Sequence, residues 1–383
     1  MRRYKIIPNA AKILFVAVMI STTVLHPSPF ALGREAEQDT VKQKRKGFFG
    51  FPIIFHSPET KLAIGASGGY YYRQAPKAPS VAGSDTASRP STIMPSLIYT
   101  QKQQIISGLG VDLYWKNETY HLTGGVLYSK FPDTFYGIGN NTPEELAEDY
   151  TPRTFGLGMD FQKTVRPRLY LGIQYQLSNS KLIEVEENGL LAKGNILGSA
   201  GGVVSSAGLS INLDTRNNIY YPSSGSFYEL SASLSGRIIG SDFDFNGYGV
   251  DLRKYIPVFS SHVLAFQGLM NIITGDAPFQ SLSELGGDSI MRGYFGGRYR
   301  DKNLLAAQME YRLPVWWRFG LVGFAGYGDV ADKLRHFELN SFKYSFGWGI
   351  RYLFSRAEKI NLRFDFGYGK GSSEFYINLT EAF

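Results

Sequence analysis

The chain has 383 residues, including 43 glycines, 27 phenylalanines and 25 tyrosines, and 43% of its residues are apolar. This length fits either two or three soluble domains or one large β-barrel. The glycine and aromatic content favours many short alternating strands over a helical domain. Cysteine is absent from the sequence, which excludes disulfide scaffolds, thiolate zinc sites and cysteine nucleophiles. With only five scattered histidines, we expect no metal site and no cofactor.

The formal net charge of +7 is concentrated at the N-terminus. Residues 1–46 contain nine Lys and Arg residues against three acidic ones, which leaves 31 basic and 30 acidic residues in the rest of the chain. Because this remainder is almost neutral, we do not expect a nucleic-acid partner.

Residues 1–33 have the features of a secretory signal peptide. Arg2, Arg3 and Lys5 precede an apolar run at 13–24, and the small residues at 31–33 offer a cleavage site. The run is about a dozen residues long, whereas a membrane-spanning helix needs roughly 20. We therefore expect export through a signal peptide, then a short charged periplasmic tail at 34–47.

The rest of the chain, 48–383, alternates between apolar and polar residues with turn residues between segments. For example, Leu169, Leu171 and Ile173 alternate with Tyr170 and Gly172. No segment here is apolar for 18 residues, so a membrane-embedded form must be a closed barrel, because only helices and barrels satisfy every backbone group in lipid.

Three observations favour a lipid-facing barrel over a soluble sandwich. The segments run to about ten residues or more, longer than the usual strand. Aromatic pairs such as Trp316-Trp317 cluster at segment ends, as in membrane-interface girdles. Phe383 closes an alternating segment, as the C-terminal signal of outer-membrane barrels does. We therefore predict an all-β fold, a transmembrane antiparallel β-barrel in the outer membrane of a Gram-negative bacterium.

We expect sixteen strands, an even number as bacterial barrels require. The longest stretch without strand pattern, 275–302, falls between the eleventh and twelfth strands and is predicted to fold inward as a long loop. The Pro/Ser/Ala-rich segment 74–90 lies where a short periplasmic turn belongs, so either it is an unusual periplasmic loop or the first strand is miscounted. The predicted strands cover 48–56, 61–73, 91–101, 103–116, 118–129, 151–165, 167–182, 200–215, 224–238, 242–257, 260–274, 303–313, 317–328, 341–354, 358–369 and 372–383.

Three short motifs lie in the connections and at the strand ends of this pattern. The long loop carries Arg292-Gly293-Tyr294 within a glycine-rich stretch that begins at Gly286. The next two motifs are a strand end of the form E-x-R-x-P and a turn that begins D-x-R. The strand end consists of Glu310, Arg312 and Pro314. The turn contains Asp214, Arg216, Pro222 and Gly225.

These motifs together resemble the BamA/TamA outer-membrane assembly and translocation superfamily, also called bacterial surface antigens. Arg292-Gly293-Tyr294 is similar to the (V/I)RG(F/Y) loop motif of that family, with Met291 in the first position. The motif stands between the eleventh and twelfth strands, where the family has it. The tail 363–383 is similar to the family's last two strands, so the resemblance covers about 48–383.

Arg292 needs a partner, because a partly desolvated guanidinium is costly unless it meets carboxylates or carbonyls. Gly293 permits a tight turn, and Tyr294 can pack against the inner wall. The resemblance implies that the inner face of the following strands holds the arginine, but this chain has Gly326 where many members carry an aspartate. Asp365 and Asp329 are the candidate partners.

The resemblance implies a protein that assists insertion or export of outer-membrane or surface polypeptides, its clients, in contact with outer-membrane lipid. A weak seam between the first and last strands would template a client strand. BamA-like proteins usually carry periplasmic POTRA domains, for which 34–47 is too short, so a periplasmic partner would have to replace them.

Two rival functions stay open. A passive porin-like channel would use the inward loop as a constriction. A barrel phospholipase or protease needs a clustered catalytic set, and the five histidines show no evident partners in sequence. We expect no enzyme activity and assign no catalytic residue.

Overall fold

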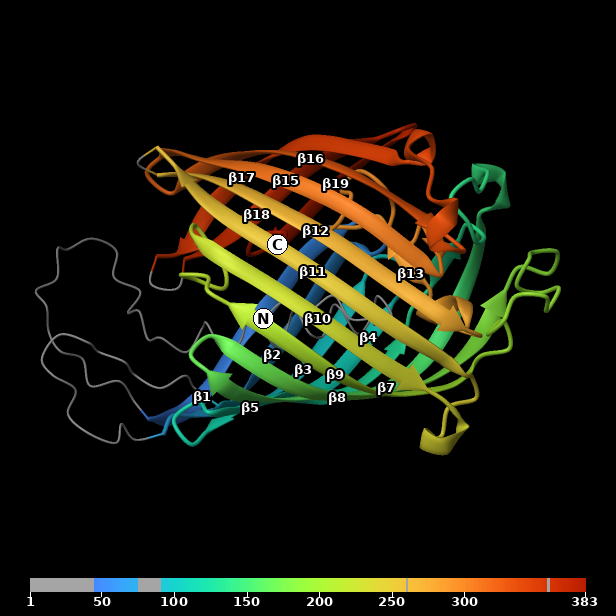
Figure 1. The fold of residues 1–383 in the computed structure, drawn as a ribbon, viewed down its shortest axis with the longest axis horizontal. Coiled ribbons are helices and arrows are strands. Elements are labelled where there is room, and N and C mark those ends of the chain that lie inside the picture. The colour runs from blue at the N-terminus through green and yellow to red at the C-terminus, as the bar shows by residue number, and fades with distance from the viewer. Residues whose placement is uncertain (1–44, 75–90, 260, 357–358) are drawn as a thin grey trace, which may run out of the picture.

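The computed structural model describes residues 45–74, 91–259, 261–356 and 359–383. In these residues the chain forms one antiparallel sheet that closes into a tilted barrel (Figure 1). The expected signal peptide at 1–33 lies outside the described residues, as do most of the tail at 34–47 and all but the first residue of the segment 74–90.

The large sheet has seventeen strands, one of which, β6, is a three-residue piece paired with β7. The remaining sixteen follow chain order around the barrel, and β19 closes it against β1. The predicted closed barrel of sixteen antiparallel strands is therefore confirmed. Its strands are β1 Lys46–Ser57, β2 Lys61–Tyr72, β3 Ser91–Thr100, β4 Ile105–Trp115, β5 Tyr120–Lys130, β7 Glu148–Arg166, β8 Leu169–Val185, β9 Gly202–Asp214, β10 Gly225–Ser235, β11 Phe245–Val258, β12 His262–Gly275, β15 Asn303–Trp316, β16 Phe319–Ala331, β17 Lys343–Ser355, β18 Ile360–Gly369 and β19 Ser372–Leu379.

The other elements are short and lie in the connections. They are the strands β6 Asp133–Phe135, β13 Ser283–Leu285 and β14 Tyr299–Asp301, and the 3₁₀ turns η1 Glu144–Leu146, η2 Arg237–Ile239, η3 Phe279–Ser281, η4 Leu334–His336 and η5 Leu339–Ser341. Among the described residues, no helix is both long and apolar enough to cross a membrane.

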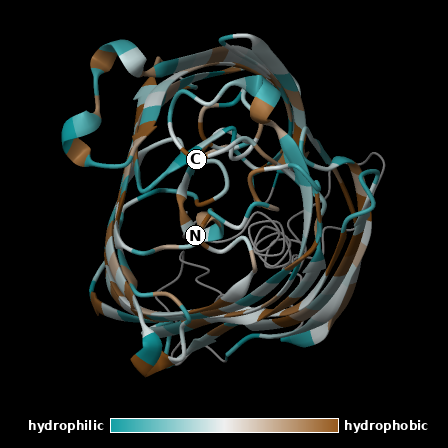
Figure 2. Cartoon of the chain, turned by 90° about the vertical axis from the view of Figure 1, so that its right-hand side faces the viewer, coloured by the Kyte–Doolittle hydropathy of each residue, from teal (hydrophilic) through white to brown (hydrophobic). Residues whose placement is uncertain are grey.

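Along the strands, apolar side chains face outward and polar side chains face inward, the reverse of a soluble protein. Ile173 on β8 and Leu209 on β9 point outward and are 61% and 65% exposed, whereas Ser210 and Asn212 point inward and are buried. Figure 2, which looks from the long-loop end, shows apolar residues along the ring of strands and chain segments that cross its interior. An apolar outer face around a polar lumen is the arrangement that lipid requires.

The two ends of the barrel differ in their connections. The end at which β1 begins has short turns such as 167–168 and 317–318, while the other end has the long loops between β5 and β7, β8 and β9, β12 and β15, and β16 and β17. In outer-membrane barrels the short turns face the periplasm. Strand order puts the connection between β2 and β3 at this short-turn end, and β1 is present as the first strand, so of the two alternatives for 74–90 a miscounted first strand is wrong.

Aromatic side chains surround the short-turn end. Trp316 and Trp317 lie at the turn between β15 and β16, are 71% and 62% exposed, and pack against Phe319. Trp115 and Tyr120 stack across the turn between β4 and β5. Amphipathic rings at this height are typical of a membrane–water interface.

A charge placed on the outward face tests whether that face contacts lipid. We expect Ile173→Lys to destabilise the barrel in phospholipid vesicles by about 1–4 kcal/mol, because a charge on the lipid-facing surface is poorly solvated. Gln174→Lys, one residue along and on the lumen side, is the matched control. Urea unfolding followed by tryptophan fluorescence measures both. Equal losses for the two variants would contradict the assignment.

Candidate functional site

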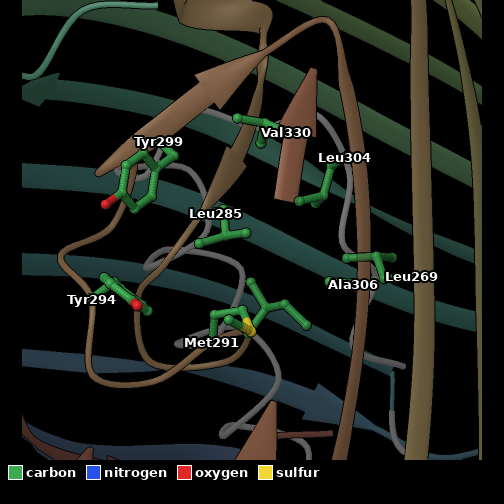
Figure 3. Packing of buried hydrophobic residues seen from close by; sticks show 9 residues of the cluster. Leu269, Leu285, Met291, Tyr294, Tyr299, Leu304, Ala306 and Val330 are labelled. Carbon is green, nitrogen blue, oxygen red and sulfur yellow. The ribbon is translucent and has the colours of Figure 1, made fainter. Parts of the chain in front are cut away.

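The loop between β12 and β15 packs against the inner face of the barrel. Its apolar residues Leu285, Met291, Tyr294 and Tyr299 form a buried cluster with side chains of β12, β15 and β16 (Figure 3). The strand residues of this cluster are Leu269, Leu304, Ala306 and Val330. They form an apolar patch on the inner face of the barrel, so the loop has an apolar surface on which to bury its own.

Arg292 is the most constrained charge of the loop. Its side chain is 1% exposed and donates hydrogen bonds to Asp365 of β18 at 2.6 Å and to Glu310 of β15 at 2.5 Å. The ring of Phe324 lies 3.6 Å from the guanidinium carbon. Two carboxylates and an aromatic face thus offset the charge of a cation removed from water.

Three further arginines extend this contact into a network. Arg312 bonds Glu310 at 2.8 Å, and Arg351 bonds both Asp365 at 2.6 Å and Glu381 at 2.8 Å. Arg363 reaches Asp288 at 3.2 Å. The network therefore holds four arginines and four carboxylates, and charge balance of this kind is what a buried cluster requires.

Gly293 and Tyr294 fit against two glycines of β18. Gly293 has φ +115°, and a Cβ there would lie 2.6 Å from the backbone of Tyr368. A Cβ on Gly367 would lie 2.6 Å from the Arg292 carbonyl carbon, and one on Gly369 would lie 2.5 Å from the Tyr294 ring. The loop and β18 can approach this closely because Gly293 and Gly367 have no side chain where the two backbones meet, and Gly369 leaves room for the Tyr294 ring.

The Tyr294 hydroxyl is also fully used. It donates to the Tyr344 carbonyl oxygen at 3.0 Å and accepts from the Lys370 backbone N–H at 2.8 Å. Burial raises the pKa of this phenol, so it keeps the proton that it donates. Tyr294 thus ties the loop to β17 and to the hairpin between β18 and β19.

A residue of the loop, Met291, fills the space beside Gly326. A Cβ at this position would lie 2.9 Å from the Met291 sulfur, so the thioether occupies the space where a larger residue would point. Asp365 and Glu310, rather than a residue at position 326, bind Arg292. Asp329, the other candidate partner, instead accepts hydrogen bonds from Asn140 at 3.0 Å and Ser341 at 2.5 Å.

The turn and strand-end motifs meet at the short-turn end. Asp214 and Arg216 form an ion pair at 2.6 Å, and Gly225 has φ +96°, where a Cβ would lie 2.2 Å from the Thr215 carbonyl oxygen. Arg312 donates to the Pro222 carbonyl oxygen at 3.2 Å. Pro314 lies at the end of β15, next to an irregularity in its pairing with β16.

The structure corrects the extent of the last strand, which was predicted to run over 372–383 and to end at Phe383. β19 ends at Leu379, and Thr380 has φ +65°. Phe383 is then buried in the lumen with Tyr255, Val263 and Ala265 of β11 and β12. The reason is electrostatic, because Arg351 binds Glu381 and Arg312 donates to the Phe383 carbonyl oxygen at 3.0 Å.

Sequence reasoning missed two other arginines of the loop. Arg300 is buried between the rings of Phe135 and Phe279 and lies 3.6 Å from Glu284. Arg298 donates to both the side chain and the carbonyl oxygen of Thr142 at 2.9 Å. The spacing Arg298-Tyr299-Arg300 was the available signal, since basic residues flanking an aromatic residue suit such stacking.

The described histidines do not form a charge-relay triad. His121 contacts Asp112 at 2.7 Å and Thr123 at 3.0 Å, but both contacts use Nε2. A relay of this type requires the acid on one ring nitrogen and the nucleophile on the other. His262 and His336 contact Tyr311 and Asp332, and His26 lies outside the described residues.

The barrel closes between β1 and β19 through few contacts. β1 pairs with β2 along all twelve of its residues, and β19 pairs with β18 along all eight of its residues. Among the described residues, β1 and β19 share one register position, His56 with Ile377. Beside it, the His56 ring donates to the Phe375 carbonyl oxygen at 3.1 Å. We call this junction the seam.

The Arg292 network supplies a prediction for stability. Arg292→Gln should lower the free energy of unfolding by about 3 kcal/mol, because Glu310 and Asp365 each lose a buried cationic partner. Arg237→Ala removes an exposed arginine that lies 3.8 Å from Asp244 and should cost less than about 1 kcal/mol. Urea unfolding in vesicles measures both, and similar small losses would contradict a bracing role for Arg292.

Comparisons with known proteins agree with this architecture. The Omp85 superfamily domain matches residues 93–383. No curated protein sequence matches the chain. The crystal structure of BamA from Haemophilus ducreyi lacking POTRA domains 1–3 is similar with a TM-score of 0.60 and 15% identity, over 97% of this chain and 78% of that one. CdiB from Escherichia coli is similar with a TM-score of 0.53 and 9% identity, over 94% and 69%. The resemblance inferred from the motifs is thereby confirmed, and the chain belongs to the Omp85 superfamily of outer-membrane β-barrels.

Proposed function

We propose that this barrel assists the insertion or export of outer-membrane or surface polypeptides by opening at the seam. The observation that carries the proposal is the single register position shared by β1 and β19, against continuous pairing of both strands on their other sides. Backbone pairing is the main force that joins neighbouring strands, so the barrel is weakest at this junction.

β1 offers a client strand a suitable edge. It pairs with β19 only near its end, at His56, so the part from Lys46 onward has no β19 partner among the described residues. Its outward face is apolar, with Phe48 85% and Ile54 60% exposed. A client strand could pair with this backbone by β-augmentation while its own apolar side chains face lipid.

The wall from β15 to β18 is braced against opening. Arg292 ties the long loop to β15 and β18, and Arg312 and Arg351 tie the C-terminal residues to β15, β17 and β18. Deformation of this wall would separate buried charges, whereas opening of the seam disrupts few polar contacts. The difference in cost supports the seam as the moving part.

The proposal includes the expected domain arrangement, with a signal peptide at 1–33, a short charged tail at 34–47 and the barrel after it. The partners would be outer-membrane lipid, client polypeptides and a separate periplasmic protein. The residues named above have structural roles, and none is assigned to catalysis.

A reversible lock on the seam tests this function. The chain has no cysteine, so His56→Cys with Ile377→Cys places the thiols at the shared register position. We expect oxidation in cells to deplete particular outer-membrane or surface proteins, and reduction to restore them, because a closed seam exposes no edge. Each single cysteine variant under the same treatment is the control. An unchanged envelope with a fully locked barrel would instead favour a passive channel.

A further inference from the structure

We infer that the long loop latches the seam closed from inside the barrel, and that Glu59 is the positioning residue through which the latch holds the β1–β2 hairpin. This inference rests on the proposed function, since a latch matters only if the seam opens. The loop segment 293–296 contacts both hairpins that border the seam, β1–β2 on one side and β18–β19 on the other. It therefore joins strands that scarcely pair directly.

On the first side, the contact is made by Glu59 in the turn between β1 and β2. Its carboxylate accepts a hydrogen bond from the Gly296 backbone N–H at 2.5 Å, and its side chain is buried. Gln104 fixes the turn by donating to the carbonyl oxygens of Glu59 and Pro132, each at 2.8 Å. These bonds fix the backbone from which the Glu59 side chain extends.

On the second side, several contacts hold the loop to β18 and β19. The Tyr376 hydroxyl accepts from the Gly293 N–H and donates to the Tyr294 carbonyl oxygen, both at 3.1 Å. Ser372 donates to the Gly293 carbonyl oxygen. With the Tyr294 hydroxyl and the Arg292 ion pair to Asp365, these contacts make the loop part of the β18–β19 wall.

The loop makes more contacts with the β18–β19 hairpin than with the β1–β2 hairpin, and this difference decides which side it leaves when the seam opens. Arg298 also ties the loop to Thr142, and Lys102 lies 5.1 Å from the centre of the Phe295 ring. Thr142 belongs to the connection between β5 and β7 and Lys102 to the connection between β3 and β4, so neither contact holds β1 directly. The β1–β2 hairpin is held through Glu59. When the seam opens, the loop stays with β19 and the hydrogen bond from Gly296 to Glu59 breaks. The opening equilibrium therefore depends on that bond.

The two partners of the bond can be changed independently. Glu59→Ala removes the acceptor, and Gly296→Ala adds a Cβ that would lie 2.9 Å from the Glu59 carboxylate oxygen. Glu59→Gln keeps an oxygen that can accept from the same N–H. Glu144→Ala, an exposed acid of the η1 turn, is the matched control.

The experiment measures the seam itself in the full chain in lipid nanodiscs. Spin labels at Leu62→Cys and Ser373→Cys, both exposed positions on the two hairpins, report their separation by pulsed electron resonance. We expect Glu59→Ala and Gly296→Ala to raise the ratio of long to short distances about tenfold, the order expected for loss of one intramolecular hydrogen bond. Glu59→Gln and Glu144→Ala should keep the wild-type distribution to within about twofold.

Two outcomes would overturn the inference. One is an unchanged distance distribution in folded Glu59→Ala and Gly296→Ala barrels, and the other is an equal rise in the Glu144→Ala control. The readout needs no client, so it is separate from the test of function. A latch that opens on mutation while the envelope is insensitive to seam locking would support the latch and contradict the proposed function.

Discussion

The buried guanidinium of Arg292 is the constraint on which the lumen of this barrel depends. A cation removed from water must meet opposite charge, and the arginine meets Glu310 and Asp365 from two different strands. Each of these carboxylates then contacts a further arginine, which brings Glu381 and the C-terminal residues into the barrel. A single loop residue thus organises one wall from the long-loop end to the short-turn end.

The consequence is a barrel with unequal sides. The wall from β15 to β18 is joined by buried ion pairs and by the loop that packs on it, while the junction between β1 and β19 has one register position among the described residues. Motion will concentrate where fewest interactions are lost. This asymmetry, rather than any single side chain, connects the fold to the proposed function.

Close backbone contact is what allows the loop to serve as a brace. Gly293, Gly367 and Gly369 meet where no Cβ fits, so the loop lies directly on β18. Met291 fills the space above Gly326, and the arginine takes its carboxylates from β15 and β18. The loop motif and the strand residues around it are therefore one packing unit, although they are far apart in the sequence.

The sequence by itself determined the local features. Period-two alternation identified sixteen strands and their outward faces, because side chains alternate across any strand regardless of its neighbours. The resemblance of the loop motif to that of a known family singled out Arg292, and the chemistry of a buried arginine required a carboxylate partner, with Asp365 and Asp329 as candidates. Only the tertiary structure decided the inward turn of Phe383, the choice between Asp365 and Asp329, and the meeting of Glu59 with Gly296, 237 positions apart. Those contacts depend on strand register and on how a loop folds over the lumen, and neither leaves a periodic trace in the sequence.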